Sequence, residues 1–232
     1  MMEHENQKKK PNGLIRRIII AVLLLIMIAS AISLVKEWMD AAAQRRLEES
    51  LAEAARQTET ETEPPETEEE TEAETEAPYV SPIDFAPLLA TNPDTIGWIR
   101  VPDTKIDYPI VQSPDNQYYL HKDFEGKDSV YGTIYLDADS KPDFSGWNNP
   151  IYGHHMKDGS MFKDVVKFKD QDFFENHRYF EIYTPERTIH LKTLGCYYSD
   201  SNGIVRKTSF KSQASFDKSV SYTHLTLPTN SL

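Results

Sequence analysis

The sequence predicts a mainly β domain with short helices, arranged as a barrel, over residues 79–220. Two observations support this fold class. Short runs of alternating apolar and polar residues recur along the region, and turn-forming proline, glycine and aspartate separate them. The helical patterns between the runs are few and short, which favours a barrel over a doubly wound sheet.

The predicted elements follow from these patterns in chain order. Asn92 and Pro93 end the first helix, and Ser160 can cap the second. A turn at 185–187 joins the last two strands into a hairpin. The predicted strands span residues 97–101, 106–111, 132–136, 150–152, 179–184 and 188–198, and the predicted helices span residues 83–90, 161–168 and 171–176.

A long apolar run at residues 18–35 precedes this domain. With the apolar pair before it, the run approaches the roughly 20 residues that cross a bilayer as a helix. Five lysines and arginines precede it, so the positive-inside bias predicts a cytoplasmic segment at 1–13, a single-pass signal-anchor at 14–35 and an extracellular remainder. A cleaved signal peptide is the alternative, because residues 29–31 resemble a cleavage site, but the run is longer than a usual signal core.

Residues 36–78 predict a polar helix followed by a disordered, Glu/Thr-rich linker. The helix, at 39–57, carries charges of both signs and is expected to be solvated. Residues 58–76 contain ten glutamates and no basic residue, which accounts for most of the formal net charge of −12. Such a segment cannot bury enough apolar surface to offset its ordering entropy, and we expect an extended stalk. The rest of the chain has no clustered basic face, so no nucleic-acid partner is expected.

A histidine pair follows the predicted strand at 150–152. Gly153 precedes His154 and His155, and it permits a close approach of other backbone or ligand atoms. Imidazole titrates near neutral pH, so it can exchange a proton or pair with a thiolate. On spacing alone a structural role is the stronger interpretation. Adjacent residues of an extended chain point to opposite faces, which argues against a shared metal ion and leaves a metal hydrolase remote.

Several blocks in order nevertheless resemble class B sortases, the membrane-anchored cysteine transpeptidases of Gram-positive bacteria. These blocks cover most of residues 83–220 and are specific when taken together. They read NPDTIGWI at 92–99, IDYPIVQ at 106–112, DNQYYL at 115–120, IYGHHM at 151–156 and KDGSMF at 157–162.

The resemblance implies a sortase-type β-barrel with an active site of His, Cys and Arg. His154 matches the catalytic histidine, a general acid/base, and His155 is its neighbour. The implied reaction cleaves a C-terminal sorting signal of a surface protein through a Cys thioester, and transfers the acyl group to a peptidoglycan-precursor or pilin amine. No cofactor and no metal are implied.

The sequence departs from this family after about residue 220. The resemblance implies a nucleophile in a Thr-x-Thr-Cys-like context and an Arg on the following strand, whereas residues 221–232 contain neither. Cys196, the single cysteine, is expected to pack in the core of the strand at 193–198 rather than to act as nucleophile. Arg206 lies in a polar, loop-like stretch and does not match the family arginine. We therefore expect a domain truncated before its Cys and Arg, followed by an unrelated tail at 221–232.

An incomplete barrel exposes strand edges and an open core. The 232-residue chain is thus expected to be inactive and prone to aggregation. The alternative is a non-catalytic, membrane-tethered binding or scaffold protein that keeps a sortase-like groove.

Overall fold

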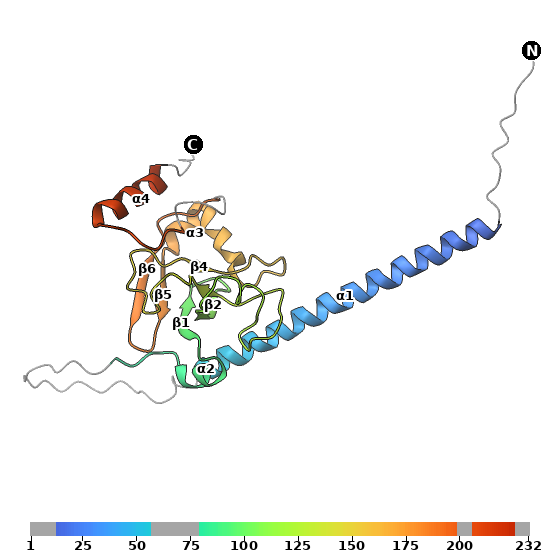
Figure 1. Ribbon diagram of the computed structural model, residues 1–232, viewed down its shortest axis with the longest axis horizontal. Coiled ribbons are helices and arrows are strands. Elements are labelled where there is room, and N and C mark those ends of the chain that lie inside the picture. The colour runs from blue at the N-terminus through green and yellow to red at the C-terminus, as the bar shows by residue number, and fades with distance from the viewer. Residues whose placement is uncertain (1–12, 57–78, 199–205, 226–232) are drawn as a thin grey trace, which may run out of the picture. The chain divides into compact units, whose positions relative to one another are not determined.

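The computed structural model describes residues 13–56, 79–198 and 206–225 (Figure 1). The chain divides into two compact units, residues 1–46 and residues 47–232. The predicted stalk and the last seven residues of the predicted tail lie outside the described residues, so both stay predictions.

Helix α1 (Gly13–Arg56) continues without a break through the predicted anchor and the predicted polar helix. Its apolar part has a mean hydropathy of 3.1 over 18 residues and is fully exposed. By length and composition this helix can cross a membrane. The boundary between the anchor and the polar helix is not marked by any change in backbone structure.

The last turns of α1 belong to the core of the second unit, which corrects the expectation of a solvated helix. Leu51 is 8% exposed and Ala55 1% exposed, and both lie in a buried cluster with Phe85 and Leu88. The backbone carbonyl of Ala55 accepts a hydrogen bond from the Asp84 N–H at 3.0 Å. The four-residue spacing places both apolar side chains on one face, while Glu53 between them is exposed.

Six strands form one curled sheet in the order β4-β3-β2-β1-β5-β6. The hairpin of β5 and β6 is visible beside β1 in Figure 1. All neighbours are antiparallel except β2 and β3, which are parallel. In the described part of the chain, β4 and β6 are the two edges, so the mainly β prediction is confirmed as an open half-barrel with short helices. The strands are β1 (Thr95–Arg100), β2 (Asp107–Val111), β3 (Tyr135–Leu136), β4 (Ile151–Tyr152), β5 (Tyr179–Tyr183) and β6 (Thr188–Lys192).

Trp98, on β1, is the largest fully buried side chain of the sheet, with 1% of its surface exposed. Its indole Nε1 donates to Asp107 Oδ1 at 2.6 Å, and Arg100 Nε donates to the same oxygen at 3.0 Å. The indole therefore satisfies its single donor while its rings fill the core.

Two of the short helices pack differently: Phe85 and Leu88 of one share the buried cluster of Trp98, and the other lies against the 3-10 helix. Helix α2 (Phe85–Thr91) is capped by Asp84, and α3 (Gln171–Asn176) is capped by Asp170. The helix predicted after Ser160 is the 3-10 helix η2 (Phe162–Lys169) and has no side-chain cap, because the Ser160 hydroxyl donates to Asp158 instead.

Helix α4 (Gln213–Leu225) runs across the predicted start of the unrelated tail. The backbone of residues 221–225 thus continues a helix that begins eight residues earlier in the chain. The structure marks no change at residue 220.

Candidate functional site

The site is built where β4 ends. Gly153 follows the strand and has no room for a side chain: a Cβ here lies 2.3 Å from Ile134 Cδ1 and 2.9 Å from Phe162 Cδ2. Glycine is therefore required by close packing, and it allows the next residue to approach the neighbouring backbone.

His154 is half-buried against the segment before β3. A Cβ on Gly132 lies 3.2 Å from His154 Nδ1 and 2.6 Å from the carbonyl oxygen of Tyr119, so Gly132 sits between the imidazole and that backbone. Gly132 has a φ of 62°, which a side-chain-bearing residue seldom adopts. Two glycines thus bring the ring close to the body of the domain.

Burial lowers the pKa of His154, and the nearby His121 lowers it further. Both effects disfavour the charged imidazolium, since burial removes water and His121 can carry a like charge. The neutral ring is the dominant form at neutral pH, and it can accept a proton from a substrate or a nucleophile.

His155 does not share this environment. It is exposed and forms an isolated antiparallel bridge with Met161. Among the residues that the structure describes, no group of three or more His, Cys, Asp or Glu side chains is placed to hold a metal ion.

A chain of polar side chains, not expected from the sequence, reaches Tyr152 at the end of β4. The Tyr152 hydroxyl donates to Asp137 Oδ2 at 2.7 Å, and Asn116 Nδ2 donates to the same oxygen at 3.0 Å. Arg206 Nε donates to the Tyr152 hydroxyl at 3.1 Å, with its guanidinium 5.1 Å from the ring centroid. The sequence placed Arg206 in a polar, loop-like stretch, and no local pattern indicated its contact with Tyr152, which lies 54 positions earlier.

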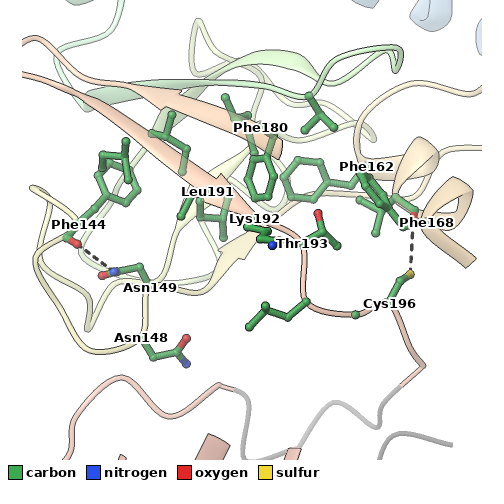
Figure 2. Close-up of a pocket in the computed structure, with 18 of the residues that line it drawn as sticks. Phe144, Asn148, Asn149, Phe162, Phe168, Phe180, Leu191, Lys192, Thr193 and Cys196 are labelled. Atoms are coloured by element: carbon green, nitrogen blue, oxygen red, sulfur yellow. Dashed lines mark hydrogen bonds between the residues drawn. The ribbon is translucent and has the colours of Figure 1, made fainter. Parts of the chain in front are cut away.

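Cys196 lies elsewhere, and the strand and core predicted for it are wrong. Strand β6 ends at Lys192, and the thiol is half-buried in the segment that follows. Its Sγ donates to the Val165 carbonyl oxygen at 3.4 Å, the dashed contact beside η2 in Figure 2. Burial raises the pKa of Cys196, and Lys169 opposes the shift only in part.

Cys196 lines an apolar cavity of about 680 Å³ on the inner side of β5 and β6, and His154 is not among its walls. Its polar side chains include Asn149, which donates to the Phe144 carbonyl oxygen at 3.1 Å (Figure 2). A thiol with a raised pKa and no imidazole partner is a poor nucleophile. The structure therefore does not bring Cys196 and His154 together.

Comparison with known proteins assigns the chain. No family model matches it. Sortase B of Listeria monocytogenes is 36% identical over 126 residues, which is 54% of this chain and 51% of the relative. A crystal structure of sortase B from B. anthracis superposes with a TM-score of 0.60 at 30% identity and covers 80% of both chains. The chain belongs to the class B sortase family. A structure of the Listeria protein agrees, with a TM-score of 0.56 at 34% identity over 60% of this chain and 79% of that one.

The class B sortase assignment confirms the resemblance found in the sequence. The chain spans about half the length of the curated relatives it matches. Within the domain, the histidine pair follows β4, whereas Cys196 lies on the apolar cavity.

Proposed function

We propose that His154 is the general acid/base of a sortase-type transpeptidation. The observation that carries the proposal is a half-buried imidazole with a lowered pKa, held at the end of β4 in a chain of the class B sortase family. His155, one residue later and exposed, lacks this environment and serves as a neighbour.

The chemistry follows from the neutral imidazole. The neutral imidazole first takes the proton of a cysteine thiol, which gives a thiolate and an imidazolium. The thiolate attacks the carbonyl carbon of the scissile amide, and the imidazolium gives this proton to the amide nitrogen as the C–N bond breaks. The resulting thioester is attacked by an amine, which gives a proton back to the imidazole as the thiolate departs. An arginine near the carbonyl oxygen stabilises the negative charge that develops there.

We propose as substrates surface proteins with a C-terminal sorting signal, and as acceptor a peptidoglycan-precursor or pilin amine. The proposed location is the cell membrane, with residues 1–13 in the cytoplasm and the domain outside. The length and apolar composition of α1, together with the basic residues that precede its apolar run, support this topology.

We propose that the 232-residue chain does not form the thioester by itself. Its single cysteine, Cys196, contacts Val165 and lies in a cavity without His154. The nucleophile that pairs with His154 is therefore a cysteine outside these 232 residues, as the family resemblance implies. The separation of Cys196 from His154 is equally consistent with the alternative function, a membrane-tethered binding or scaffold protein.

A fusion protein tests the catalytic role. Residues 221–232 are replaced by the part of the Listeria relative that follows its match to this chain, and the fusion is assayed for transfer of a sorting-signal peptide to an amine. His154→Ala is expected to reduce transfer by about 10²–10⁴-fold, the usual contribution of a general acid/base. The matched His155→Ala and Cys196→Ser variants are expected to stay within about threefold, because neither side chain reaches the reacting atoms.

Two results contradict the proposal. Transfer that survives His154→Ala removes the histidine from the chemistry, and transfer by the unfused chain that is lost on Cys196→Ser makes Cys196 the nucleophile. Binding of the peptide by the unfused chain without cleavage, together with a stop codon after Leu232 in genomic DNA, favours the scaffold function.

A further inference from the structure

The loop that carries His154 returns on itself between β4 and η2. The backbone carbonyl of His154 accepts from the Phe162 N–H at 2.8 Å, and His155 pairs with Met161 as an antiparallel bridge. Gly159, with a φ of 92°, closes the turn through its N–H to the Met156 carbonyl oxygen at 3.3 Å. The orientation of His154 thus depends on where the returning strand of the loop is held.

Met161 is the strained residue of this returning strand. Its φ is 56° and its ψ is −136°, a backbone conformation that residues with a Cβ rarely adopt. Its side chain is almost fully buried, at 2% exposed, so relaxation is opposed by packing. Strained residues of this kind persist where the surrounding structure over-determines them, often near functional sites.

A hydroxyl from a different part of the sheet holds this residue. Tyr108, on β2, is 7% exposed, and its hydroxyl oxygen accepts a hydrogen bond from the Met161 N–H at 3.0 Å. Strand β2 lies between β1 and β3, so the tyrosine comes from an interior strand rather than from a loop. Burial raises the pKa of Tyr108, which keeps the hydroxyl protonated over the working pH range.

We infer that Tyr108 is a positioning residue for His154, acting through Met161 and the bridge to His155. This role matters for catalysis only if His154 is the general acid/base proposed above. The geometric coupling itself is independent of catalysis.

A second hydroxyl supports the turn from the other side. Tyr131 donates to Asp158 Oδ2 at 3.0 Å, while Asp158 Oδ1 accepts from both the backbone N–H and the hydroxyl of Ser160. Asp158 keeps the Ser160 contacts if the Tyr131 hydroxyl is lost. Tyr131 therefore contributes less to the loop than Tyr108, whose loss leaves the buried Met161 N–H without its acceptor.

The test measures the accessibility and the environment of His154 in the full chain in detergent micelles. Carbethoxylation of His154 by diethyl pyrocarbonate is followed by mass spectrometry at pH 7.5, where the ring is neutral, and the ring Cε1–H resonance is followed by NMR. Tyr108→Phe is expected to raise the rate about tenfold, the change in a local opening equilibrium that follows the loss of one buried hydrogen bond. The resonance of His154 is expected to shift and its titration to move toward the ordinary histidine pKa.

Tyr183→Phe is the matched control. Tyr183 is also 7% exposed and lies on β5 of the same sheet, and its hydroxyl donates to Glu181 rather than to the His154 loop. This variant is expected to leave the rate and the resonance of His154 unchanged. Tyr131→Phe is expected to raise the rate two- to threefold, roughly the effect of losing one of several contacts to Asp158.

The inference is overturned if Tyr108→Phe leaves the rate and the resonance of His154 as they are, or if Tyr183→Phe changes them equally. The carbethoxylation rate and the NMR resonance of His154 can both be measured without catalytic activity. A failed positioning role is therefore distinguishable from a failed catalytic role, which only the fusion assay with His154→Ala can show.

Discussion

The two reactive side chains of the domain lie in regions that are packed in opposite ways. His154 follows β4 in a loop where Gly153 and Gly132 leave no room for a side chain and where buried hydroxyl groups hold the backbone. Cys196 lies beyond the end of edge strand β6, on a cavity of about 680 Å³. The exposed, apolar Trp147 and Leu194 also line this cavity. The packing around His154 holds its ring in one place, whereas the thiol of Cys196 is directed to the Val165 carbonyl oxygen and its raised pKa disfavours the thiolate.

The largest expected difference is in stability, between the buried core of the sheet and the cavity on which Cys196 lies. Trp98→Ala removes a side chain that is 1% exposed and hydrogen-bonded to Asp107, and it is expected to cost about 3–5 kcal/mol of the free energy of unfolding. Trp147→Ala removes a side chain that is 46% exposed at the cavity, and it is expected to cost less than about 1 kcal/mol. Urea denaturation of both variants measures the difference. Equal costs would mean that the cavity region is closed in solution.

Alanine substitutions at two glycines compare the packing around His154 with the packing at the cavity. Gly153→Ala forces a methyl group against the buried Ile134 and is expected to destabilise the domain by about 1–3 kcal/mol. In Gly146→Ala the new methyl group meets Asn149 Oδ1 at 2.8 Å, the end of a half-buried side chain on the cavity wall. Because that amide can move, a cost below about 1 kcal/mol is expected. Thermal melts of the two variants test this, and an equal loss at both glycines would argue against the tighter packing around His154.

The stability contributions of His154 and Cys196 are expected to change with pH in opposite directions. The folded-state pKa of His154 is lowered from its ordinary value of 6.5, so below 6.5 the unfolded chain binds more protons than the folded chain. The His154 contribution is therefore fully present above 6.5 and is lost as the pH falls through the window between 6.5 and the lowered value. Urea denaturation from pH 8 to pH 5 should show this loss in the parent chain and not in His154→Gln. A parallel loss in both would assign the pH dependence to other groups.

The stability contribution of Cys196 is expected to fall as the pH rises, and it is the smallest effect expected. Burial raises its pKa above the ordinary 9.0, so above 9.0 the unfolded chain loses the thiol proton first and folded stability falls as the pH rises. The same shift lowers the thiolate fraction at pH 8, and iodoacetamide should alkylate Cys196 more slowly in the folded chain than in urea. Mass spectrometry of the alkylated protein measures both rates. Faster alkylation of the folded chain would contradict the raised pKa.

The strongest local signals predicted the fold well. The alternating run at 97–101 and the run at 106–111 correspond to β1 and β2, because each pattern spans several residues and has a turn beside it. The strands predicted at 132–136 and 150–152 correspond to β3 and β4, but each of these strands has only two residues and is shorter than predicted. Strand β6 ends six residues before the predicted end at residue 198. Among the described residues, the last backbone hydrogen bond of this hairpin is the one that the Thr193 N–H donates to the Arg178 carbonyl oxygen.

The expectation that the end of α1 is fully solvated was wrong. Glu48, Glu49 and Glu53 dominate its composition and mask the apolar stripe of Leu51 and Ala55, which packs into the core. A count at four-residue spacing could have found the stripe. Of the site, His154 was predicted from motif and resemblance, but its half-buried environment and its lowered pKa depend on residues that precede it by more than twenty positions.

The sequence by itself determined the class B sortase family, the apolar helix before the domain and the order of the strands along the chain, and it predicted His154 as the catalytic histidine. These follow from periodicity, charge and short ordered motifs, which are local properties of a chain. Only the tertiary structure decided that Tyr108 holds Met161 across 53 positions, that Arg206 reaches Tyr152 across 54, and that the lone thiol lies in an apolar cavity. The physical reason is that hydrogen bonding and burial depend on which segments the sheet places side by side, and no local pattern records that choice.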